Sequence, residues 1–156
     1  MIILELLSPI PGPLKVEESK YKDLYQKKIS LHYGNFYIFD TYVISEISEG
    51  VHFNWALAEG VINLVYEHFG SRDIKVAYIS NRINNYTVHA QDWLNFYKER
   101  HHLEAFAVVA YSKLGLMNVI LEKVFSQVRL KKFRDLDSAV EWVLSLKPGE
   151  PHKENL

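Results

Sequence analysis

The feature that most constrains the fold of this chain is a regular alternation of two apolar patterns after residue 50. Short runs rich in β-branched and aromatic residues alternate with stretches whose apolar residues recur at three- and four-residue spacing. The first pattern is typical of buried strands and the second of amphipathic helices. We expect strands at 74–79, 105–111 and 128–133, and helices at 54–69, 91–100, 115–125 and 137–146. This order predicts parallel strands joined by right-handed crossovers, and hence an α/β fold.

The segment before this alternation has the pattern of a β-hairpin. Residues 25–33 and 36–47 are both strand-like, and Gly34-Asn35 between them tolerates positive φ angles. The second run is apolar on both faces, which is typical of a central strand. The sequence therefore predicts a mixed, mostly parallel sheet of about five strands with helices, opened by an antiparallel hairpin.

The predicted helices carry recognisable ends and faces. Asn54 is placed to cap the first helix, Gly70 to end it in a left-handed conformation, and Asp135 or Asp137 to cap the last. In the helix at 115–125, an apolar stripe is expected, with Val119 beside it; the stripe consists of Leu116, Ile120 and Val124.

The length of 156 residues is that of one domain. Three prolines between residues 9 and 13 interrupt a short apolar run, so residues 1–24 are expected to form an N-terminal arm. Residues 25–147 are expected to form a single α/β domain, and residues 148–156 a polar tail.

Composition excludes several classes of function. With 18 basic and 19 acidic residues, the chain lacks the positive excess of nucleic-acid-binding proteins. Its apolar start has no preceding Lys or Arg, Glu5 interrupts it, and no other run approaches the length of a membrane span. The absence of Cys fits a reducing compartment. We therefore expect a cytoplasmic protein with no nucleic-acid partner and no membrane span.

The end of the chain resembles a known family. The segment FRDLDSAVEWVLSL has the strand, acidic cap and A-x-x-W-L helix that end small domains of the SpoIIAA-like, or STAS, family. The matching residues are Phe133, Asp135, Ala139, Trp142 and Leu144, with Val143 in the place of the usual Leu. The IKVAYIS strand and the opening hairpin-then-helix fit in order, so the resemblance spans about residues 25–147.

This resemblance implies a superhelix of βα units whose strands are adjacent in chain order. Family members include anti-anti-sigma factors and cytoplasmic modules of anion transporters, and the fold is similar to that of lipid-carrying CRAL-TRIO domains. Regulatory members carry a phosphorylatable Ser in an Asp-x-Ser-Gly setting. The corresponding residue here is Ser80, followed by Asn81 and Arg82, without the neighbouring Asp and Gly.

Polar residues gather where the predicted strands end. Ligands of parallel sheets bind at the carboxyl ends of strands, and these ends carry the candidate ligand-binding residues Ser80, Asn81, Arg82, Ser112 and Lys113. Arg82 and Lys113 are suited to an anion. The alternative is that these residues are polar because loops meet water.

The sequence shows no recognisable catalytic or metal-binding motif. It lacks Cys and a Gly-x-Ser-x-Gly elbow, and its seven His show no metal-ligand spacing, with His101 and His102 simply adjacent. We expect no catalytic residue, no metal site and no cofactor. An aromatic cluster of Trp93, Phe96 and Tyr97 is expected to belong to the core, with a homodimer interface as the alternative.

Two functions from different classes follow. The first is a non-enzymatic SpoIIAA/STAS-like regulatory or interaction module that binds a protein partner or itself. The second is a protein that binds a small molecule, an anion or a lipid head group at the carboxyl ends of the strands. A hydrolase or transferase with unfamiliar geometry is a weaker third hypothesis.

Overall fold

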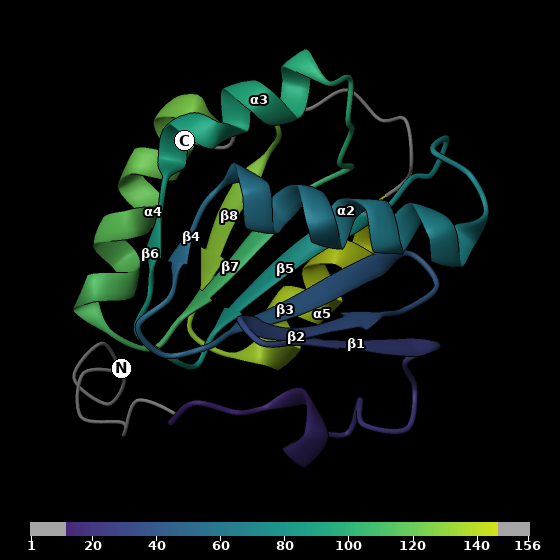
Figure 1. Ribbon diagram of the computed structural model, residues 1–156. Helices are drawn as coiled ribbons and strands as arrows, with labels where there is room; N and C mark the ends of the chain where they lie inside the picture. The colour runs from purple at the N-terminus through teal and green to yellow at the C-terminus, as the bar shows by residue number, and fades with distance from the viewer. Residues whose placement is uncertain (1–11, 147–156) are drawn as a thin grey trace.

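A computed structural model describes residues 12–146, and for residues 114–118 it describes the backbone alone. Within this part, six strands form one sheet in the order β1-β2-β3-β5-β7-β8 (Figure 1). Their bounds are Lys27–Leu31, Gly34–Ile38, Tyr42–Ile47, Ala77–Arg82, Phe106–Ala110 and Leu130–Phe133. The pairs from β3 to β8 are parallel. The predicted α/β class with a mostly parallel sheet is confirmed.

The antiparallel opening differs in detail from the prediction. The first turn lies at His32-Tyr33, and the run expected to form one strand at 36–47 is interrupted at Phe39–Thr41, so that β1, β2 and β3 form a three-stranded meander. Gly34 is inside β2, where a Cβ would lie 2.8 Å from the carbonyl oxygen of Glu46. This glycine therefore permits close strand packing and does not form the turn.

The three crossover helices lie on the same face of the sheet. They are α2 (Trp55–Phe69), α3 (Trp93–Lys98) and α4 (Lys113–Phe125), and they join strands that follow one another in chain order. Because right-handed crossovers that advance in one direction place their helices on one side, this face carries all three. β4 (His52–Phe53), directly before α2, and β6 (Thr87–Val88), before α3, form a small parallel pair beside the start of α2 (Figure 1). We call this side the helix-rich face.

The opposite face is covered by α5 (Leu136–Ser145), which lies behind the sheet in Figure 1, and by residues around the 3₁₀ helix Val16–Glu18. We call it the packed face. Its core includes Val16, which is fully buried, and Tyr21. The expected tail at 148–156 and residues 1–11 of the expected arm lie outside the described residues.

The helix ends follow the predicted chemistry. The side chain of Asn54 accepts a hydrogen bond from the Leu57 amide, and Gly70 ends α2 with a φ of 70°. Asp135 accepts from the Ser138 amide and is thereby the cap of α5. In α4, however, Ile120 and Val124 are exposed and Val119 and Glu122 are buried, so these two residues of the expected stripe do not lie on the buried face. The side chain of Leu116, the third residue of that stripe, lies outside the described part of the chain.

Candidate functional site

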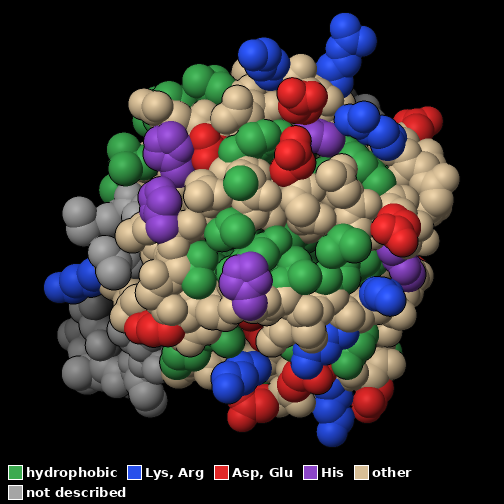
Figure 2. Space-filling model, viewed as in Figure 1, with side chains coloured by type: hydrophobic (Ala, Val, Ile, Leu, Met, Phe, Trp, Pro, Cys, Tyr) green, Lys and Arg blue, Asp and Glu red, His purple; other side chains and the backbone are tan. Residues whose placement is uncertain are grey.

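Two adjacent cavities lie between the sheet and helices α2 and α3. They share five lining residues, which are Phe53, Ala58, Tyr78, Trp93 and Phe96. The larger has a volume of about 110 Å³ and the smaller of about 80 Å³. We call the larger the apolar cavity, the smaller the polar cavity, and the two together the cleft. Figure 2 shows hydrophobic side chains interspersed over this side of the molecule.

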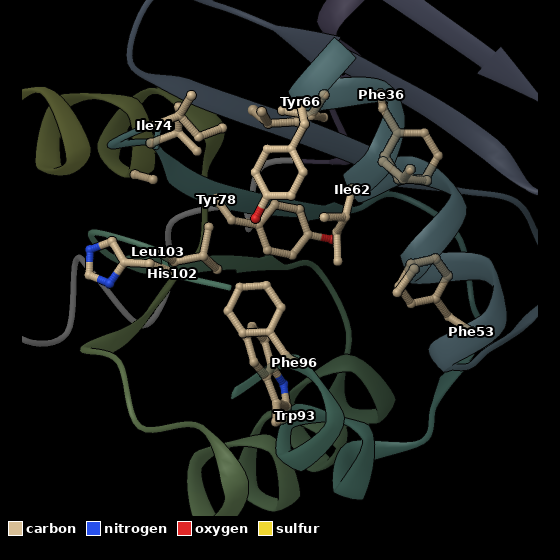
Figure 3. A pocket seen from close by; sticks show the side chains of 16 residues that line it. Phe36, Phe53, Ile62, Tyr66, Ile74, Tyr78, Trp93, Phe96, His102 and Leu103 are labelled. Atoms are coloured by element: carbon tan, nitrogen blue, oxygen red, sulfur yellow. The ribbon is translucent and has the colours of Figure 1, made fainter. Parts of the chain in front are cut away.

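The apolar cavity is lined mainly by aliphatic and aromatic side chains from α2, α3 and the sheet. Figure 3 shows Tyr66, Tyr78 and Ile62 near its centre, Trp93 and Phe96 along one side, and Phe53 and Leu103 toward opposite ends. Its tyrosine hydroxyls are already engaged, since Tyr78 pairs with Ser45 at 2.6 Å and Tyr66 with Nδ1 of His101 at 2.6 Å. This part of the cleft therefore offers contact area rather than hydrogen bonds.

The polar cavity is built around Arg82 at the carboxyl end of β5. Its Nε donates to the Ser80 hydroxyl at 3.1 Å, and its Nη2 donates to the Glu122 carboxylate from α4. The Ser80 and Tyr86 hydroxyls are 2.9 Å apart, and the guanidinium lies over the Tyr86 ring. Nη1 of Arg82 is buried and has no hydrogen-bond partner among the residues that the structure describes.

The ion pair in the polar cavity is removed from water. The side chains of Arg82 and Glu122 are 4% and 3% exposed. Burial opposes the charge of Arg82, but Tyr86 and Glu122 outweigh it and hold the pKa of Arg82 above its ordinary value. Burial also raises the pKa of Tyr86 and of Tyr78. The cavity thus contains a fixed guanidinium balanced by one carboxylate, with neutral hydroxyls around it.

The rim of the polar cavity joins the two helices that bound the cleft. Asp92 accepts a hydrogen bond from the Trp55 amide at the start of α2 at 2.6 Å, and its other oxygen lies 2.9 Å from Nδ1 of His89. Both His89 and Asp92 line the cavity. This contact fixes the start of α2 beside the 3₁₀ helix Ala90–Asp92, which leads into α3.

The structure separates the five residues predicted as a ligand site. Alternate residues of a strand point to opposite faces, so Ser80 and Arg82 line the polar cavity whereas Asn81 lies on the packed face. Ser112 and Lys113 are exposed at the start of α4. Ser80 is 1% exposed, so phosphorylation at this residue, which the family resemblance suggests, would require the end of β5 to open.

On the packed face, Asn81 belongs to a separate polar network. Its amide nitrogen donates to the Leu14 carbonyl and to Glu46 Oε2, and its oxygen accepts from the Tyr111 hydroxyl. Glu46 also accepts from the Val16 amide at 2.8 Å. Burial raises the pKa of Glu46 despite these hydrogen bonds, and it raises the pKa of Tyr111 to about 12. This network ties the N-terminal segment to the strand ends.

Glu122 and Tyr86, the two residues in direct contact with Arg82 besides Ser80, are among the cavity residues that the sequence analysis did not single out. Glu122 lies three positions after Val119, which places both on one helix face, and both are buried. The sequence signal for a buried Glu122 was therefore its position on the same helix face as an apolar residue. Among residues 12–146, no group of three or more His, Asp or Glu side chains is arranged to hold a metal ion.

These observations define a mixed α/β domain with strands in chain order and a cleft beneath its crossover helices. No family model matches the chain, and no curated protein matches it. Among solved structures, it is similar to the crystal structure of an uncharacterized DUF3478-family protein from Shewanella loihica PV-4, described as having a SpoIIAA-like fold. The two chains are 12% identical, and the match covers 75% of this chain and 90% of that one with a TM-score of 0.48.

That protein is itself uncharacterized. The function of the cleft is therefore inferred from the side chains of this chain alone. No helix in the described part of the chain combines the length and the apolar character needed to cross a bilayer.

Proposed function

We propose that this protein binds a small, largely apolar molecule in the cleft beneath α2 and α3. The observation that carries the proposal is the pair of adjacent cavities, one apolar and one containing a buried arginine with a free donor among the described residues. Binding pockets typically combine apolar walls with a few polar groups that fix orientation. This is the small-molecule hypothesis from the sequence, with the site on Ser80 and Arg82.

The size of the cleft favours a compact ligand. An apolar cavity of about 150 Å³ is large enough to hold benzene. The apolar cavity here has a volume of about 110 Å³ and adjoins a second of about 80 Å³. A single-ring or short-chain molecule that extends from one cavity into the other fits these dimensions.

Filling the cleft tests the proposal. Ala58 lines both cavities from α2, whereas Ala56 on the same helix is exposed. We expect α-methylstyrene to raise the urea midpoint of the wild-type protein through linkage and to shift amide resonances around Phe96 and Tyr78. Ala58→Phe should abolish both effects, and Ala56→Phe should preserve them.

A molecule that shifts only exposed amides, or that binds Ala58→Phe as well as the wild type, would contradict the proposal. Chemical denaturation of each variant reports whether it is folded. If Ala58→Phe does not fold, the location of the shifted wild-type resonances still decides the matter.

The interaction-module function stays a second proposal, and α4 is the surface to test for it. Ile120, Leu121 and Val124 are 64%, 57% and 72% exposed. Contiguous exposed apolar patches mark interaction surfaces, and Ile120 and Val124 lie one turn apart on this helix with Leu121 adjacent. Sedimentation of the wild type and of Val124→Asp would detect self-association through this helix, which the substitution should abolish.

A further inference from the structure

The donor capacity of Arg82 is only partly used. Nε donates to Ser80, Nη2 donates to Glu122, and Nη1 has no partner among the described residues. A buried donor without an acceptor costs free energy because it has lost its water without gaining a replacement. Arg82 lines the polar cavity, so a ligand that enters this cavity lies against the side chain that carries the unpaired donor.

The charge around Arg82 restricts what that acceptor can be. The Glu122 carboxylate already balances the guanidinium, and Asp92 lines the same cavity with its side chain 19% exposed. An anionic ligand next to Arg82 would place a further negative charge beside the buried Glu122 carboxylate, where repulsion and desolvation are both large. An uncharged acceptor meets neither penalty.

Resting on the proposed function, we infer that the ligand is an uncharged carbonyl compound, whose oxygen accepts a hydrogen bond from Nη1 of Arg82 and whose apolar body occupies the apolar cavity. Tyr78 and Trp93 line both cavities and therefore lie along the path between the two ends of such a molecule. The anion expected from the sequence is disfavoured because Glu122 already balances the charge of Arg82.

Three probes of similar size test this inference. Acetophenone carries a carbonyl oxygen, α-methylstyrene replaces that oxygen with a methylene group, and benzoate carries a negative charge at pH 7. We expect acetophenone to bind wild-type protein at least about tenfold more tightly than α-methylstyrene, since a hydrogen bond to a charged donor is of that order. Benzoate should bind more weakly than acetophenone. Dissociation constants are measured by NMR titration of the labelled protein.

A paired substitution removes the donor without leaving a lone buried charge. Arg82→Met/Glu122→Met should bind acetophenone and α-methylstyrene equally. The control, Lys28→Met/Glu17→Met, removes a more exposed ion pair of 3.2 Å from another part of the molecule and should preserve the wild-type preference. Wild-type discrimination decides the question even if the first variant does not fold.

The possible results separate this inference from the proposed function. Equal wild-type affinities for acetophenone and α-methylstyrene would overturn the carbonyl inference but would still support the binding of an apolar molecule in the cleft. Tightest binding of benzoate would overturn it in favour of an anion site. Failure of all three probes to bind would overturn the proposed function, and the inference with it.

Discussion

The two faces of the sheet carry contrasting polar clusters at the end of β5, and both clusters include residues of this strand. Residues 80–82 of β5 alternate between the faces, so that Ser80 and Arg82 lie on the helix-rich face and Asn81 on the packed face. Asn81 uses both its oxygen and its nitrogen, joining Glu46, Tyr111 and the Leu14 carbonyl. Arg82 has one nitrogen without a partner among the described residues.

This difference distinguishes a structural network from a candidate binding site. On the packed face, α5 and the N-terminal segment pack against β5 and β7 and the polar groups are matched to one another. On the helix-rich face, the cavities remain beside Arg82 and Glu122. Because native proteins rarely leave buried donors unpaired, we propose the cluster with the unpaired Arg82 nitrogen, and not the matched one, as the binding site.

The largest expected effect comes from breaking the ion pair on the helix-rich face. Arg82→Met leaves the Glu122 carboxylate buried and uncompensated, and such a loss destabilises a protein by about 3–5 kcal/mol. Adding Glu122→Leu should recover most of that stability, because the lone charge is then gone. Urea denaturation of the wild type and both variants measures the free energies of unfolding. A single variant that loses less than its double counterpart would show that the pair is not buried as described.

On the packed face, the corresponding substitution should be milder and should not affect binding. Asn81→Ala leaves the Tyr111 hydroxyl and the Leu14 carbonyl without their partner, at a cost of about 1–3 kcal/mol. Asn63 is exposed on α2, and Asn63→Ala should change the stability by less than about 0.5 kcal/mol. Affinity for α-methylstyrene should be unchanged in both variants. A weakened affinity in Asn81→Ala would mean that the two faces are coupled.

Much of this architecture was predictable because it depends on local pattern. The alternation after residue 50 and the caps at Asn54 and Asp135 are read from neighbouring residues, and the structure confirms them. The prediction that Gly34 forms the turn is wrong, because glycine is common both in turns and where strands pack closely. The decisive neighbour, the backbone at Glu46, is distant in sequence and is brought close by strand pairing.

The site was only half predictable for the same reason. Arg82 and Ser80 follow from their place at the end of a buried strand. Glu122 pairs with Arg82 across 40 positions, and this contact requires α4 to turn Val119 and Glu122 inward. Apolar periodicity alone favoured Ile120 and Val124, which the structure leaves exposed. Apolar periodicity therefore does not detect a charged residue that is buried together with its partner.

A smaller effect is expected from Glu46, the buried carboxyl of the packed face. Burial raises its pKa in the folded protein above the ordinary value of 4.5, so the folded state binds a proton more tightly than the unfolded state. Its contribution to stability is therefore greatest below pH 4.5 and is lost as the pH rises through the raised pKa. Glu46→Gln should gain stability relative to the wild type over that range, as urea midpoints at several pH values would show. Parallel curves for the two proteins would contradict the shift.

The smallest expected effect has the opposite sign and belongs to His101, beside the cleft on the helix-rich face. His101 is 8% exposed, and burial, together with Arg72, lowers its pKa below the ordinary 6.5 although Glu99 and Glu59 oppose the shift. The unfolded chain then binds a proton that the folded protein does not, so the wild type should lose stability as the pH falls below 6.5. His101→Asn should lose less over the same range, because it has no proton to gain. The variant should be less stable at neutral pH, because the His101 ring packs near Phe96 and Tyr66. The test is therefore how the difference in stability between the two proteins changes with pH, and not its size at any one pH. If the difference between the two proteins is the same at every pH, burial of His101 does not oppose its protonation, and the contrast in pH response between the two faces disappears.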